Sequence, residues 1–175
     1  MAFAEPALFE RLIDLLTTTP ADYLCAQVEA GAEAVMLFDS WAGLLPPSQF
    51  RRHVIEPTRQ IVAALKARYP HVRVVGFPRL GGVMVAEYAR QTGVDVVALD
   101  TGADIAQIRP LLPAGAGIQG TLDPISVLAG VQAMRAEARA ICPAGRALPP
   151  VFHLGHGVLP ETTVDPVADP GPHVR

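Results

Sequence analysis

The chain has 175 residues, a length that fits one domain with a sizeable hydrophobic core. Its net charge is −3 and only 18% of its residues are charged, which argues against a nucleic-acid or membrane-surface protein. The N-terminus lacks the features of a signal peptide, and no apolar run approaches the roughly 20 residues that cross a bilayer, so we expect a cytoplasmic protein.

Hydrophobic periodicity predicts helices and strands that alternate along the chain. The predicted helices cover residues 5–19, 20–30, 48–69, 82–91, 103–112 and 123–141. The predicted strands cover residues 34–41, 72–78, 94–100, 117–120 and 151–154. Each predicted strand is followed by polar residues or glycine. Strict alternation of buried strands and helices is typical of a Rossmann-like sheet or a (β/α)8 TIM barrel.

The barrel is the better prediction, because no strand is followed by Gly-x-Gly-x-x-Gly and no P-loop is present. A barrel needs eight strands and about 250 residues. This chain supplies about five βα units, so we predict a partial barrel over residues 1–160. Three prolines within seven residues cannot share a helix, and we predict an irregular tail over residues 161–175.

Polar residues gather at the predicted carboxyl ends of the strands, the edge where a barrel carries its active site. These are Asp39, Ser40, Arg79, Asp100, Gln119, Asp123 and His156. His156 stands between Gly155 and Gly157, which let another molecule approach the backbone closely.

Five segments in this order resemble the C-terminal half of the uroporphyrinogen decarboxylase family. They are FDSWAG at 38–43, GFPR at 76–79, ALD at 98–100, QGTLDP at 119–124 and LGHG at 154–157. The combination is specific, whereas any one segment alone would be weak. The likeness extends over about residues 5–163.

The resemblance implies a homodimeric barrel enzyme of haem biosynthesis that needs neither metal nor organic cofactor. Its reaction converts uroporphyrinogen III to coproporphyrinogen III and four CO2. By motif, Ser40 and His156 match substrate-binding residues of the family, and Asp39, Arg79 and Asp123 would lie just behind them. The resemblance places the catalytic aspartate in the N-terminal half, so no catalytic residue is expected in this chain, and we expect the chain alone to be inactive.

The sequence departs from the family pattern at Thr121, where asparagine is usual, and at Thr101 and His153. Two other hypotheses stay open. One is a corrinoid-linked methyltransferase, a related barrel with zinc bound by His and Cys; Cys25 and Cys142 fall in predicted helices and fit it poorly. The other is a non-catalytic barrel remnant with unpaired sheet edges.

Several residues also have purely structural interpretations. Asp39, Asp100 and Asp123 are suited to capping the next helix or bracing a loop, and Arg79 to a surface ion pair. Phe38 and Trp41 are expected in the core or at a dimer interface. We expect three histidines to be solvated: His53, His71 and His173. Ser40 has no glycine elbow, which excludes a hydrolase nucleophile.

Overall fold

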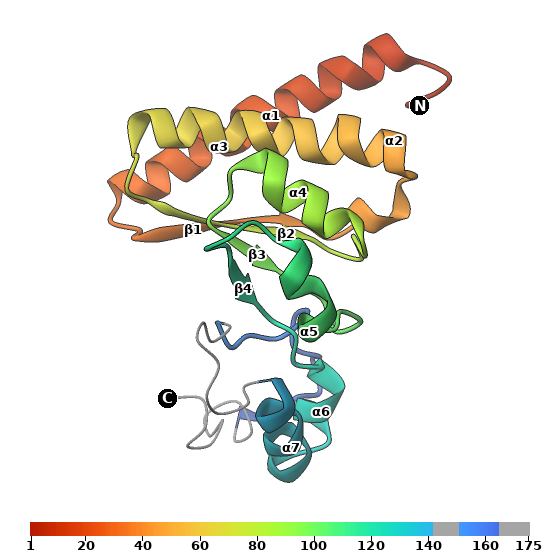
Figure 1. Ribbon diagram of the computed structural model, residues 1–175. Coiled ribbons are helices and arrows are strands. Elements are labelled where there is room, and N and C mark those ends of the chain that lie inside the picture. Colours follow the sequence, from red (N-terminus) through yellow and green to blue (C-terminus); the bar gives the residue numbers. More distant parts are fainter. Residues whose placement is uncertain (142–150, 165–175) are drawn as a thin grey trace. The chain divides into compact units, whose positions relative to one another are not determined.

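The computed structural model describes residues 1–141 and 151–164 (Figure 1). The chain divides into two compact units, Met1–Val96 and Val97–Arg175. The predicted loop at 142–150 with Cys142, and the part of the tail at 165–175 with His173, lie outside the described residues.

The fold is α/β, with the sheet strands in the order β1-β2-β3-β4. The first unit contains α1 (Pro6–Glu29), β1 (Ala34–Asp39), a 3-10 turn (Ala42–Leu44), α2 (Pro47–Phe50), a π-helical turn (Arg51–Ile55), α3 (Glu56–Arg68), β2 (Arg73–Pro78) and α4 (Met84–Thr92). The strand β3 (Val96–Ala98) begins at the boundary. The second unit continues with α5 (Ile105–Ile108), a 3-10 turn (Arg109–Leu111), β4 (Gly117–Gln119), α6 (Pro124–Leu128) and α7 (Val131–Ile141).

The two strands of the first unit run parallel, in a register that pairs Ala34 with Arg73 and Asp39 with Pro78. Helices α1 and α3 lie together on one face of this pair (Figure 1). Between them and the strands is a core of aliphatic side chains from α1, β1, α3 and β2. Its buried members are Ala21, Leu24, Cys25, Val35, Ile61, Val62, Leu65, Val72 and Val74.

Alternation along the strands separates a helix-covered face from an opposite face. Val35 and Val74 point into the helix-covered core. Phe38 and Phe77 share a register position on the opposite face and form an edge-to-face pair with ring centroids 6.2 Å apart. Phe38 and Trp41 are 65% and 69% exposed, so neither lies in the core, and the expected dimer interface stays a prediction for both.

The structure corrects the predicted helix break at Pro20, because α1 continues through this residue to Glu29. Proline removes one backbone donor and usually bends a helix. Here the segment directly after Pro20 is held by its packing, because Ala21, Leu24 and Cys25 belong to the core cluster formed with α3 and the sheet. Tertiary packing therefore outweighs the local preference of proline. Gly31, with φ +106°, follows the helix as predicted.

The predicted helix at 48–69 is helical over this range but has three parts, with the π-helical turn directly before Pro57. The predicted helix at 123–141 is two helices, because Gly130 adopts φ +107° between α6 and α7. His53 was expected in solvent; it is buried, and its ring packs edge-on against Phe9 at 4.8 Å. His71 is exposed, as predicted.

The predicted fifth strand is present only as two isolated parallel bridges, which pair Gln119 with Val151 and Leu122 with Leu154. Regular pairing is interrupted because Gly120 has φ +115°, which is incompatible with a continuous strand. The hydrogen bonds on both sides of it remain, with the Val151 N–H donating to Ile118 O at 2.7 Å.

Within the described residues, no helix is both long and apolar enough to span a membrane.

Asp95 connects α3 to the edge of β2 and leads to the first prediction. The carboxylate accepts hydrogen bonds from Lys66 at 2.7 Å, Arg73 at 2.9 Å and the Val74 N–H at 2.9 Å. Burial opposes its ionisation, but these donors outweigh that effect and hold the pKa of Asp95 below its ordinary value. We expect Asp95→Asn to lower the free energy of unfolding by about 1–3 kcal/mol at pH 7. Denaturant unfolding followed by circular dichroism measures the loss.

The lowered pKa also sets the sign of the pH dependence. The stabilisation is fully present above the ordinary aspartate pKa of about 3.9 and is lost as the pH falls through the lower folded-state value. The difference between wild type and Asp95→Asn should therefore shrink only below about pH 4. Asp22→Asn is the control, because Asp22 is 76% exposed and 3.8 Å from Arg68. A difference that stays constant down to acid unfolding would contradict the role given to Asp95.

Gly76 leads to the second prediction, because a Cβ at this position would overlap the Tyr88 hydroxyl and lie 2.8 Å from Cε1 of the same ring. Tyr88 is almost fully buried, and its hydroxyl is hydrogen-bonded to Thr58. We expect Gly76→Ala to cost about 1–3 kcal/mol of stability through overpacking. In a Tyr88→Phe background, which removes the first of these clashes, the same substitution should cost less. Equal costs in both backgrounds, measured by urea unfolding, would disprove this contact.

Candidate functional site

Ser40 lies in the turn after β1, beside the loop that follows β2. The Arg79 N–H donates to Asp39 O at 3.0 Å, and the Gly43 N–H donates to Arg79 O at 2.9 Å. The first bond follows directly on the Asp39–Pro78 pair, and the second joins the two loops that leave the strands. The Arg79 side chain adds a long hydrogen bond of 3.4 Å from Nη1 to Ser40 O. Arg79 therefore holds both ends of the 39–43 loop.

The two loops approach so closely that only glycine fits at position 43. A Cβ on Gly43 would overlap the carbonyl of Leu80 and lie 2.5 Å from the Leu80 Cβ. Leu80 itself has φ +59°, a conformation that is costly for a bulky side chain. The surrounding hydrogen bonds thus hold a strained junction directly beside Ser40.

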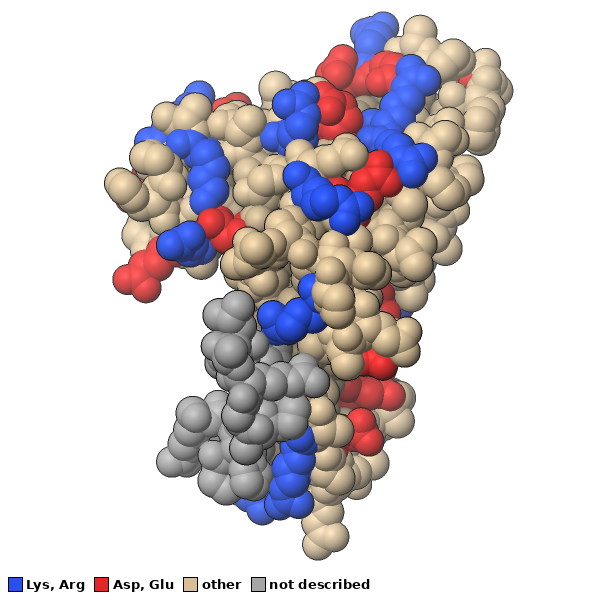
Figure 2. Space-filling model, viewed as in Figure 1, with Lys and Arg blue, Asp and Glu red and all other residues tan. Residues whose placement is uncertain are grey.

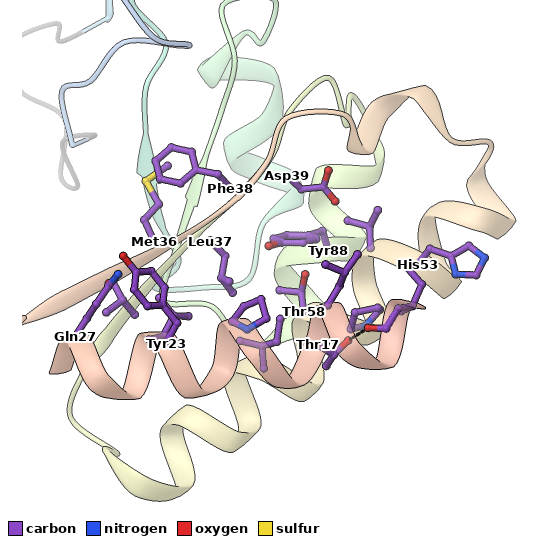
Figure 3. Close-up of a pocket in the computed structure, with 18 of the residues that line it drawn as sticks. Thr17, Tyr23, Gln27, Met36, Leu37, Phe38, Asp39, His53, Thr58 and Tyr88 are labelled. Carbon is purple, nitrogen blue, oxygen red and sulfur yellow. Dashed lines mark hydrogen bonds between the residues drawn. The ribbon is translucent and has the colours of Figure 1, made fainter. Parts of the chain in front are cut away.

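Asp39, the last residue of β1, lies on the helix-covered face of the sheet. Asp39 lines a cavity of about 720 Å3 on the helix-covered face, between α1, β1 and α3 (Figure 3). Leu37 points toward α1 in this view, whereas Phe38 points away from it.

The Asp39 carboxylate has a structural task, since it accepts a hydrogen bond from the Trp41 N–H at 3.3 Å. Burial raises the pKa of Asp39, and backbone hydrogen bonds from Trp41 and Ala42 act in the opposite direction. Tyr88 lies beside it in the cavity wall (Figure 3). The geometry therefore supports a structural role for Asp39, in which its carboxylate holds the loop after β1.

In the second unit, His156 is exposed on a loop whose backbone is fixed by its neighbours. The Gly155 N–H donates to Leu122 O at 2.8 Å, and a Cβ on Gly155 would overlap the backbone N of Thr101. Glycine at 155 thus lets the histidine loop lie directly on the loop after β3. Among the described residues, the imidazole of His156 makes no hydrogen bond or ion pair.

The other polar residues of the second unit brace its loops. The Asp100 carboxylate accepts from the Gly102 N–H at 2.9 Å, which closes a turn after β3. Asp123 is the N-cap of α6 and accepts from the Ile125 N–H at 2.9 Å, as predicted for aspartate before proline. Gln119 is buried at the end of β4.

The structure thus brings Asp39, Ser40 and Arg79 together in the first unit, and gathers Asp100, Asp123 and the His156 loop in the second. Sequence reasoning missed the roles of Gly43, Gly76 and Tyr88. A glycine inside a strand signals close approach by another group, so Gly76 could have been noticed. The partner Tyr88 could not, because the contact depends on how α4 packs on β2.

Metal ligation has little support in this geometry. Cys25 is buried in α1, as the predicted helix required. No three His, Cys, Asp or Glu side chains lie close enough to share a metal ion in the part of the chain that the structure describes.

Comparisons with known proteins agree with the sequence motifs. The family model described as uroporphyrinogen decarboxylase (URO-D) matches residues 1–169. A uroporphyrinogen decarboxylase from Gluconacetobacter diazotrophicus is 61% identical over 97% of this chain and 48% of its own length. One from Gluconobacter oxydans is 57% identical over 96% of this chain and 48% of its own length. The chain therefore spans about half the length of these curated relatives.

A solved structure supports the fold independently. A methyltransferase from Methanosarcina mazei matches with a TM-score of 0.79 at 20% identity, covering 95% of this chain and 48% of that one. At this identity the likeness concerns the fold alone, and it agrees with part of a larger barrel. The sequence relatives do not favour the methyltransferase hypothesis for the activity. With a family match over nearly its whole length, the chain belongs to the uroporphyrinogen decarboxylase family.

Proposed function

We propose that this chain provides the substrate-binding half of a uroporphyrinogen decarboxylase, which converts uroporphyrinogen III to coproporphyrinogen III and four CO2. Family membership over residues 1–169 is the observation that carries the proposal. The substrate is a tetrapyrrole with carboxylate side chains, so a binding site must present hydrogen-bond donors. Ser40 and His156 are the proposed substrate-binding residues, and both carry a side-chain group that can donate.

The proposed reaction protonates an electron-rich pyrrole carbon, and the resulting cation accepts the electrons of the breaking C–CO2 bond. The substrate is thus its own electron sink, which is why the proposal includes no cofactor. The protein must hold the polyanion and stabilise the developing positive charge with a preorganised carboxylate. We assign that carboxylate to the half of the barrel that this chain does not contain, since Asp39, Asp100 and Asp123 already brace loops.

The proposal includes a homodimer in the cytoplasm, without nucleic-acid or membrane partners. The low content of basic residues supports the last point, with 14 Lys and Arg against 17 Asp and Glu.

The proposal is tested by supplying the missing half. The 175-residue chain is co-expressed with the part of the Gluconacetobacter diazotrophicus relative that it does not match, and coproporphyrinogen is measured chromatographically after oxidation. We expect product from the co-purified pair and none from either polypeptide alone. Product from the 175-residue chain alone would show that it contains the catalytic acid. A stable pair without decarboxylation would count against the proposed function.

Ser40→Ala and His156→Ala test the two binding residues in that pair. A hydrogen bond to a charged group contributes about 1.5–3 kcal/mol, so each variant should lose about tenfold or more in kcat/KM. Ser48→Ala and His71→Ala are matched controls, because both positions are exposed and neither lies at the carboxyl end of a strand. Losses of similar size in the controls would mean that the substitutions act through stability.

A further inference from the structure

Arg79 differs from every other arginine of the first unit in its burial. This unit contains eight arginines, of which Arg79 alone is half-buried and the other seven are exposed. Five of the exposed arginines have a carboxylate within salt-bridge distance. These are Arg51, Arg52, Arg59, Arg68 and Arg73. Figure 2 shows the same pattern, with basic and acidic side chains side by side over this part of the surface.

The half-buried guanidinium of Arg79 has N–H donors without an acceptor among the described residues. Its Nε atom is fully buried and has no hydrogen-bond partner, and no carboxylate of the described residues lies within salt-bridge distance. Among the described residues, its side-chain hydrogen bond is the long contact to Ser40 O. A guanidinium withdrawn from water without an anion is costly, and burial normally brings a paired charge with it.

The position of Arg79 shows where that anion would come from. Ser40 and Arg79 directly follow β1 and β2, and the Arg79 side chain contacts Ser40 O across the two loops. Both residues therefore lie at the carboxyl ends of neighbouring parallel strands, the edge at which a barrel binds its ligands. The junction that carries them is fixed by backbone hydrogen bonds and by the close approach of Gly43 to Leu80. A donor held on such a base is preorganised and needs little reordering when an anion binds.

We propose that Arg79, together with Ser40, binds a carboxylate directly, rather than supporting the site from behind. A guanidinium presents a planar fork of N–H donors that matches the two oxygens of a carboxylate. The carboxylate has two possible sources. One is a side chain of the tetrapyrrole, which rests on the proposed function; the other is an Asp or Glu of the polypeptide that completes the barrel.

The first measurement needs no activity. In the 15N-labelled 175-residue chain, the Nε–Hε signal of Arg79 is assigned by its loss in Arg79→Gln, and sodium acetate is titrated at constant ionic strength against sodium chloride. We expect a saturable shift of this signal with acetate and none with chloride. Signals of Arg51 and Arg59, whose donors already bind Glu87 and Glu56, should stay in place. An Arg79 signal that responds equally to both salts would overturn the proposal.

The second measurement separates the two sources. Trp41 is the single tryptophan of the chain, lies next to Ser40 and is 69% exposed, so its fluorescence reports on bound uroporphyrin III. In the co-purified pair, Arg79→Gln should weaken uroporphyrin binding at least tenfold, Arg79→Lys less, and the exposed control Arg11→Gln under twofold.

If the acetate shift occurs but Arg79→Gln instead weakens association of the two polypeptides, the carboxylate belongs to the protein. If the acetate shift occurs and uroporphyrin does not bind at all, the carboxylate site stands and the proposed function fails. If neither uroporphyrin affinity nor association changes in Arg79→Gln, the proposal is wrong.

Discussion

The parallel register of β1 and β2 is the constraint on which the rest of the first unit depends. It pairs Phe38 with Phe77 and Asp39 with Pro78, and thereby decides which side chains meet the helices. A slip of one residue would move the aliphatic set of β1 out of the core cluster under α1 and α3. The same register makes Ser40 and Arg79 neighbours beyond the strand ends. Burial of the core therefore also fixes the position of the polar pair.

Close approach of other groups to the backbone is the second feature on which the structure depends, and glycine makes it possible at several positions, of which three concern the strands and loops described above. The absence of a Cβ leaves room for Leu80 at Gly43, for the ring of Tyr88 at Gly76 and for the backbone of Thr101 at Gly155. In each case the structure gains contact between main chains or with a buried ring, which a Cβ would prevent. The loops that carry Ser40 and His156 are consequently held by their backbones, and the side chains remain available for other contacts.

Much of the fold could be predicted because it depends on local apolar patterns. The strands at Ala34–Asp39 and Arg73–Pro78 are such patterns, and so is the cap at Asp123. The errors arise where distant packing overrides a local preference, as in the helix that continues through Pro20 and the burial of His53 against Phe9. The motifs identified the residues at the strand ends, but their partners are set by register and loop contact. Those cannot be read from the sequence of either strand alone.

The polar residues at the strand ends fall into two groups, acids that accept backbone hydrogen bonds and side chains that can donate them. The acidic side chains of Asp39, Asp100 and Asp123 each accept a backbone N–H and so close a turn or begin a helix. The residues without such a task are a hydroxyl, a guanidinium and an imidazole, at Ser40, Arg79 and His156. All three can donate hydrogen bonds, and none is a carboxylate. Within each unit, the acids named here therefore accept hydrogen bonds from the backbone, and the remaining side chains are hydrogen-bond donors that suit the carboxylate ligand we propose. Under the proposed function the catalytic carboxylate comes from outside these residues, and the chain spans about half the length of its curated relatives.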